Sequence, residues 1–167
     1  MLLELENAKV PMKQVYLLSE ELKRKPEYIT LVQTLTLNKS RPLMGLKGTY
    51  GLYGSQEWWD NIERKIIPLR FISGIIKRTY VAGQDPSPID NCFSMILDNG
   101  SLHEEGIEDF IRKEDKKLFR IGSRVEIVYA LDEMKEQPAP DGGVNYADVI
   151  LEVAVSLQPV EKTNSSV

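Results

Sequence analysis

The chain has 167 residues, of which 42% are hydrophobic and 28% are charged, and its formal net charge is −4. This composition is typical of a globular protein that can bury a core, and the acidic balance gives no general attraction to nucleic acid or anionic membranes. Cys92 is the single cysteine, which excludes an internal disulfide and a cysteine metal cluster. The sequence has no secretory signal pattern and no apolar run of membrane-helix length, so we expect a cytoplasmic protein.

The first forty residues allow two interpretations at their start. Residues 12–24 are predicted to form a helix that ends before Pro26, and a strand over residues 10–17 followed by a polar turn is the alternative. Residues 28–37 alternate along the chain and are rich in β-branched side chains, which predicts a strand. A further strand is predicted at residues 49–53, where glycines allow a close crossing with a neighbour.

A glycine repeat with neighbouring aromatic rings is the most distinctive segment. Glycine recurs every third residue, and the aromatic side chains follow closely; the residues are Gly45, Gly48, Gly51, Gly54, Tyr50, Tyr53, Trp58 and Trp59. The segment is either a strand-and-turn packed on a core or an exposed recognition surface. Its spacing matches neither common phosphate-binding glycine motif, which disfavours a phosphate cradle.

A helix is predicted at residues 56–64, with Ser55 as its N-cap and Glu57 in its first turn. Trp58 pairs with Ile62 four residues later, so this side of the helix is expected to face the core. Adjacent helical residues point about 100° apart, which places Trp59 at a boundary or contact surface.

The C-terminal part contains a regular series of strands separated by turn signals. We predict strands at residues 66–81, 92–97, 101–107, 124–134 and 149–157, a helix at 108–117, and loops at 83–91 and 138–143. Gly74 indicates a bend or bulge within the first strand. Asn99 and Gly100 form a hairpin signal typical of a type I′ turn.

This element order predicts a β-rich α+β protein. Residues 66–158 are expected to form an OB-like small β-barrel of three strands, a helix and two strands. Residues 1–65 are expected to add an α/β extension that carries the glycine and aromatic segment, packed on the barrel as one compact unit. Residues 159–167 are expected to form a flexible tail.

Catalytic and metal-binding patterns are weak in this sequence. His103 is the single histidine, and it has carboxylates nearby but no serine or cysteine partner. The acidic residues around it are interspersed with lysines and arginines, which is typical of a solvated helix face. Cys92 lies among apolar residues and is interpreted as a core thiol. We therefore expect no cofactor and no metal. The sequence contains no catalytic motif, so a third, enzymatic hypothesis would require a site assembled from scattered residues.

The leading functional hypothesis is a non-catalytic protein-binding or adaptor module. It is expected to bind another protein through the glycine and aromatic segment, with Tyr50, Tyr53 and Trp59, and through the loops at 83–91 and 138–143. One version is an inhibitor or immunity-type protein, which is consistent with an acidic chain that neutralises a basic target. The alternative is single-stranded nucleic-acid binding on the barrel face, where the cations Arg70, Lys77 and Arg78 accompany aromatic rings. The net charge disfavours this alternative, and a steep loss of affinity with salt is the property that separates the two hypotheses.

Overall fold

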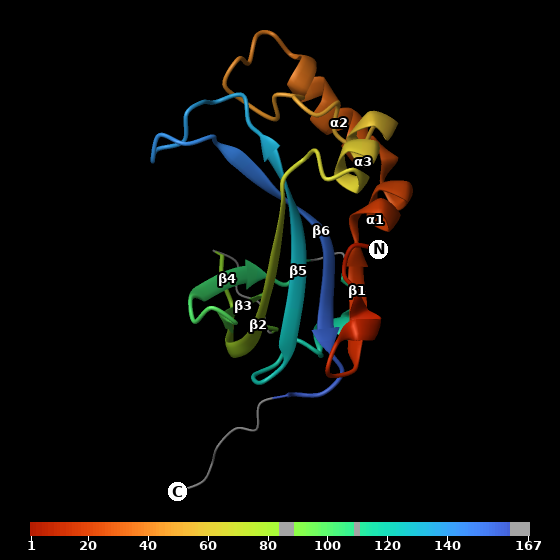
Figure 1. Ribbon diagram of the computed structural model, residues 1–167, viewed down its shortest axis with the longest axis vertical. Coiled ribbons are helices and arrows are strands. Elements are labelled where there is room, and N and C mark those ends of the chain that lie inside the picture. Colours follow the sequence, from red (N-terminus) through yellow and green to blue (C-terminus); the bar gives the residue numbers. More distant parts are fainter. Residues whose placement is uncertain (84–88, 109–110, 161–167) are drawn as a thin grey trace, which may run out of the picture. The chain divides into compact units, whose positions relative to one another are not determined.

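The computed structural model (Figure 1) describes residues 1–83, 89–108 and 111–160. These residues belong to two compact units. Unit 1 comprises Met1–Leu17, Phe71–Ile127 and Glu152–Val167, and unit 2 comprises Leu18–Arg70 and Val128–Leu151. The division predicted between residues 65 and 66 stays a prediction.

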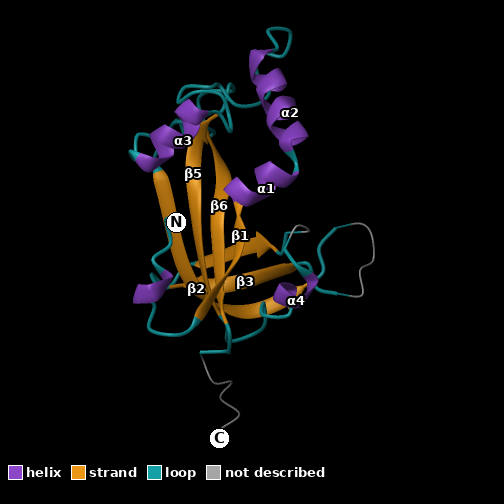
Figure 2. Ribbon diagram, turned by 90° about the vertical axis from the view of Figure 1, so that its right-hand side faces the viewer, coloured by secondary structure: helices purple, strands orange, loops and turns teal. Residues whose placement is uncertain are grey.

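The secondary structure is a six-stranded antiparallel sheet with a few helices, as Figure 2 shows by colour. The strands are β1 (Met12–Leu17), β2 (Leu69–Tyr80), β3 (Cys92–Leu97), β4 (Leu102–Gly106), β5 (Arg124–Glu133) and β6 (Tyr146–Ser156). The helices are η1 (Leu5–Asn7, a 3₁₀ turn), α1 (Leu18–Arg24), α2 (Pro26–Leu37), α3 (Gln56–Glu63) and α4 (Lys113–Lys116). The predicted β-rich α+β class is therefore confirmed.

The sheet is open, with the order β1-β6-β5-β2-β3-β4. Within the described ranges no strand pairing joins β1 to β4, so the OB-like barrel is not confirmed. A barrel requires its two edge strands to pair with each other. Here a sixth strand, β1, pairs with β6 from Met12 opposite Ser156 to Leu17 opposite Glu152, and it forms one edge of the sheet.

The segment before α2 combines the two interpretations of residues 12–24. The predicted strand at residues 10–17 corresponds to β1. The predicted helix at residues 12–24 is right only in its second half, which forms α1. A buried carboxylate fixes this region in unit 1. Glu152 accepts hydrogen bonds from the backbone N–H groups of Leu2 (2.7 Å) and Leu3 (3.0 Å) and from the side chain of Gln14 (3.2 Å). A carboxylate with several donors is stable when buried.

The β2–β3–β4 part of unit 1 follows the predicted strands. Gly74 lies where two backbones approach closely, because a Cβ added there would be 2.6 Å from the carbonyl oxygen of Ile96. The register shift of β2 lies further along, between Ile76 and Arg78. In the hairpin, Gly100 has φ +88° but Asn99 does not have positive φ, so the predicted type I′ turn is wrong. Glycine after a type I turn closes the hairpin instead.

The remaining C-terminal predictions are also met in outline. Strands β5 and β6 and the 138–143 loop lie where the sequence places them. The predicted helix at 108–117 is reduced to the four residues of α4, and residues 109 and 110 lie outside the described residues. The predicted 83–91 loop includes residues 84–88, and the predicted tail includes residues 161–167, both outside the described residues.

The strand predicted at residues 28–37 is wrong, because this segment is helix α2. Pro26 occupies the first turn of α2, where its missing N–H removes no helical hydrogen bond and its fixed φ suits a helix. The sequence analysis used Pro26 only as the end of the preceding helix. Since α2 has no neighbour in the sheet, a helix is the conformation that satisfies its backbone groups internally.

The strand predicted at residues 49–53 is also wrong. These residues form turns and isolated bridges, and Gly45, Gly48, Gly51 and Gly54 have φ values of +90°, +82°, +95° and +75°. Such values are incompatible with an extended strand. The glycine within this range, Gly51, lies against α3 instead of a neighbouring strand, because a Cβ added there would be 3.0 Å from Cγ of Glu57.

Candidate partner-binding surface

In unit 2 the glycine segment, residues 45–54, packs against α2. A Cβ added to Gly45 would lie 2.8 Å from Cγ of Leu35, and one added to Gly54 would lie 3.1 Å from Ile29. The side chain of Gln33 donates to the carbonyl oxygen of Tyr53 (2.9 Å). The glycines therefore allow α2 to pack closely against this segment. Of the two roles predicted for the segment, this packing corresponds to the structural one.

The C-terminal end of α2 is capped by a lysine from a distant part of the chain. Lys135 Nζ donates to three carbonyl oxygens, those of Leu35 (2.6 Å), Asn38 (3.3 Å) and Arg41 (3.0 Å). The last carbonyl groups of a helix have no internal donor, and the negative end of the helix dipole favours a cation. Lys135 thus holds both the helix end and the turn that follows it.

The N-terminal end of α3 is organised around a buried tryptophan. Ser55 Oγ accepts from the backbone N–H of Trp58 (3.2 Å), which confirms the predicted N-cap. Trp58 is fully buried with Ile62, as predicted, and its indole N–H donates to Asp132 Oδ2 (2.9 Å).

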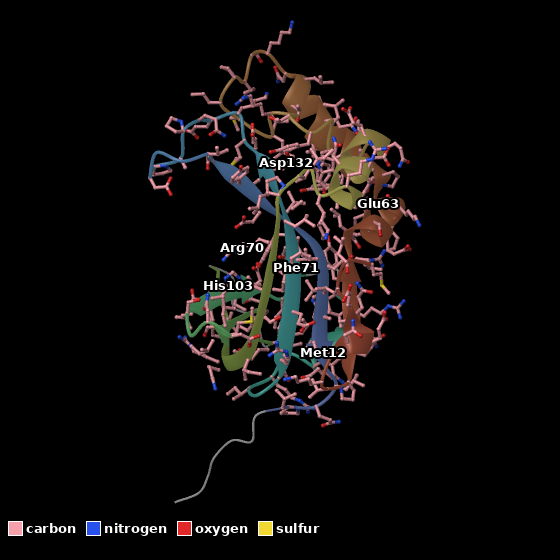
Figure 3. The ribbon with its side chains drawn as sticks, in the orientation of Figure 1. Met12, Glu63, Arg70, Phe71, His103 and Asp132 are labelled. Atoms are coloured by element: carbon pink, nitrogen blue, oxygen red, sulfur yellow. The ribbon has the colours of Figure 1, made fainter. Side chains whose placement is uncertain are left out.

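Asp132, near the C-terminal end of β5 (Figure 3), is also fully buried. Its Oδ1 atom has no hydrogen-bond partner. Burial raises the pKa of Asp132 above its usual range, and the hydrogen bond from Trp58 opposes this shift.

The predicted binding tyrosines have different environments. Tyr53 is buried, and its ring lies 4.9 Å from that of Trp58 and 6.0 Å from that of Tyr28. Tyr50 is half-buried. Burial is the main cause that raises the pKa of its hydroxyl group above the usual range, and the negative charge of Glu133 raises it further.

Trp59 is half-buried and lines an open pocket of about 310 Å³ in unit 2. Side chains from α1, α2 and α3 form this pocket, and they are Ser19, Leu22, Lys23, Ile29, Gln56 and Trp59. The boundary position predicted for Trp59 therefore holds.

The predicted cationic residues lie along β2. Arg70 belongs to unit 2, where its guanidinium lies 3.8 Å from the carboxylate of Asp148 and 5.8 Å from the ring centroid of Tyr129. Lys77 and Arg78 belong to unit 1, and Arg78 lies 4.6 Å from the ring centroid of Tyr80. The guanidinium groups of Arg70 and Arg78 therefore each have one face next to an aromatic ring of the same chain.

The largest feature missed by the sequence analysis is an exposed apolar stretch on α2 and the turn after it. No residue of α2 is buried, and the exposed fractions of Leu31, Leu37, Leu43 and Met44 are 66%, 64%, 61% and 49%. The same part of the sequence is also basic, since residues 22–50 contain six lysines and arginines but one acid. This charge pattern could have drawn attention to the segment as a surface. The strand interpretation of residues 28–37 concealed it.

The single histidine and the single cysteine of the sequence both lie in unit 1. His103 Nε2 lies 3.0 Å from Glu105, and Cys92 is a half-buried free thiol. No group of three or more histidine, cysteine or acidic side chains among the described residues could hold a metal ion. None of the described helices is long and apolar enough to cross a membrane.

Comparison with known proteins identifies the class of this chain as the immunity proteins, which are protein-binding inhibitors. A family model described as Immunity protein RhsI2 matches residues 12–156, and the chain belongs to this family. No curated protein matches the chain.

The family match confirms the hypothesis of an immunity-type protein-binding inhibitor and the expectation of a protein partner. Single-stranded nucleic-acid binding is not favoured. Binding roles for Tyr50, Tyr53, Trp59, Arg70, Lys77 and Arg78 stay predictions.

Proposed function

We propose that this protein binds a cognate toxin and inactivates it by forming a stable complex. The observation that carries the proposal is the family match over residues 12–156, which includes every strand and the four α-helices. An inhibitor of this kind needs an accessible surface rather than a catalytic centre. The open pocket beside Trp59 and the exposed apolar side chains of α2 supply such a surface in unit 2.

The partner is identified by affinity capture. The chain is immobilised and exposed to lysate of source cells with and without nuclease treatment, and the captured protein is identified by mass spectrometry and produced recombinantly. A second bait, Trp59→Ala, is first shown by circular dichroism to be folded. Loss of capture with this bait supports a contact through Trp59, and equal capture by both baits removes Trp59 from the proposed contact surface.

The inhibitory function is then tested in a heterologous host that expresses the captured protein. We expect this protein to arrest growth, and we expect co-expression of the chain to restore growth and yield a co-purifying complex. If the captured protein is harmless, or if growth stays arrested although both proteins are produced, the proposal is wrong. Capture that disappears on nuclease treatment supports a nucleic-acid ligand instead.

A further inference from the structure

Several exposed side chains lie between the middle of α2 and the end of the turn that follows it. We name this the α2 surface and define it by Leu31, Leu37, Leu43, Met44, Lys39 and Arg41, all of which are exposed. Solitary exposed apolar residues are normal, but four large ones within fourteen residues are characteristic of an interaction site.

The backbone under the α2 surface is held in place before any partner binds. Lys135 fixes the helix end and the turn through three carbonyl groups, and Gly45 lies directly beneath Leu35. The turn itself is closed by backbone hydrogen bonds from Arg41 to Asn38 (3.1 Å) and from Met44 to Arg41 (3.3 Å). A preorganised surface loses little conformational entropy on binding, which favours affinity.

The charge of the α2 surface is opposite to that of the whole chain. Lys23 pairs with Glu20, and Arg24 and Lys25 pair with Glu21. Lys39 and Arg41, in contrast, have no ion pair among the described residues. Two uncompensated cations beside exposed leucines are complementary to a partner surface that offers an apolar recess bordered by carboxylates.

A second copy of this chain is a poor occupant for the α2 surface. In a two-fold symmetric dimer the same patch meets itself, which would bring Lys39 and Arg41 near their own counterparts. Nucleic acid is also a poor fit, because its phosphates would leave the exposed leucines without apolar contacts.

We propose that the α2 surface is the contact site for the toxin, and that it binds an apolar recess on the toxin that is bordered by acidic residues. This inference rests on the proposed function and specifies its contact surface. Leucines of a helix commonly act as anchors in a groove of the partner, and cations at the rim accelerate association.

The test measures binding of the recombinant toxin, obtained as described above, to the wild type and to charge and anchor variants. Leu31→Glu should increase the dissociation constant at least about tenfold, since it replaces an apolar anchor of the contact by a charge. Leu102→Glu is the matched control, because Leu102 is similarly exposed on β4 in unit 1 and should leave binding unchanged. Circular dichroism verifies folding, and Leu43→Glu in the turn repeats the test outside the helix.

The electrostatic part is tested with a double variant, Lys39→Glu with Arg41→Glu. The association rate should fall about tenfold at low salt, and the difference should disappear in high salt because exposed charges are then screened. The control reverses the exposed Lys9 and Lys117 of unit 1, which changes the net charge equally. Equal effects of the two double variants would show that net charge alone steers association and would overturn the assigned site.

The remaining outcomes separate the site from the function. If the wild type binds the toxin and every α2 variant binds equally well, the α2 surface is wrong while the proposed function stands. If the wild type itself does not bind the toxin, the proposed function fails. Two further results overturn the assignment: a wild-type dimer in sedimentation that Leu31→Glu dissociates, or salt-sensitive binding of a labelled oligonucleotide that Lys39→Glu with Arg41→Glu abolishes.

Discussion

The two units differ in how completely each one uses its own polar and apolar groups. In unit 1 the buried carboxylates are paired, since Glu152 accepts three hydrogen bonds and Asp115 pairs with Lys13 at 2.6 Å. In unit 2, Oδ1 of Asp132 and Oε1 of Glu21 are buried oxygens without a hydrogen bond in the described residues, although Lys25 Nζ lies 3.4 Å from Oε1 of Glu21. Unit 2 also holds the exposed α2 surface.

This contrast indicates a division of roles between the units. Unit 2 exposes four large apolar side chains within fourteen residues of α2 and the following turn, whereas the exposed apolar side chains of unit 1, such as Phe71, Leu102 and Ile121, are spread along its sequence. Substitutions in the two units should therefore have different consequences. The following predictions order these substitutions by the expected loss of folding free energy.

The largest effect is expected at the contact between the glycine segment and α2. Gly45→Ala should reduce the free energy of unfolding by about 3 kcal/mol, because it combines strain at φ +90° with a clash against Leu35. Gly142→Ala isolates the strain, since Gly142 has φ +89° and open space around it, and should cost about 1 kcal/mol. Urea denaturation measures both values, and equal losses would contradict a packing role for Gly45.

The next effect concerns the buried pair of Trp58 and Asp132. Trp58→Phe should reduce the free energy of unfolding by about 2 kcal/mol, because the buried carboxylate of Asp132 then loses the indole donor to its Oδ2 atom. The loss of ring volume is separated by repeating the substitution in Asp132→Asn. A double-mutant cycle should give a coupling of about 1 kcal/mol, and a coupling near zero would mean that only packing matters.

The cap on α2 should contribute somewhat less. Lys135→Met keeps much of the side-chain length but removes the cation from the three carbonyl groups, and it should cost about 1.5 kcal/mol. Lys117→Met, an exposed lysine in unit 1, is the control and should have little effect. Hydrogen exchange should locate faster opening at the end of α2; unchanged exchange there would count against the cap.

The pH dependence of stability should reveal the burial of Asp132. Burial raises the pKa of Asp132 in the folded state above its value in the unfolded state. The contribution of Asp132 to the free energy of unfolding is therefore favourable at a pH below the usual aspartic acid pKa, and it is lost as the pH rises through the raised pKa. Asp132→Asn keeps an acceptor for Trp58 without the charge, and should stabilise the protein at pH 7. This advantage should shrink toward pH 4, and a constant difference would exclude the titration of Asp132.

The smallest effect is expected at an exposed ion pair in unit 1. Hydrogen bonds from Arg124 lower the pKa of Asp98 in the folded state. The ion pair therefore stabilises the fold at a pH above the usual aspartic acid pKa, and this stabilisation is lost as the pH falls through the lowered pKa. Asp98→Asn should nevertheless cost less than about 0.5 kcal/mol at pH 7, because the pair is solvent-screened. A cost as large as that of Trp58→Phe would erase the contrast between the units.

The sequence alone determined the features that depend on short-range patterns. The strands β2, β3, β5 and β6 were predicted from their apolar periodicity, and α3 was predicted from its N-cap at Ser55 and the pairing of Trp58 with Ile62. These signals are local, since period and capping describe neighbouring residues along one element. The immunity-type hypothesis came from the acidic charge and the lack of a catalytic pattern.

The tertiary structure decided the features that depend on distant residues. Residues 28–37 alternate as a strand would, yet they form a helix because no sheet neighbour is available to them and because Gly45, Gly54 and Lys135 hold the helix from outside. The openness of the sheet likewise follows from β1 pairing with β6 across more than one hundred residues. Periodicity reports which residues share a face, but only long-range contacts decide which partner that face meets.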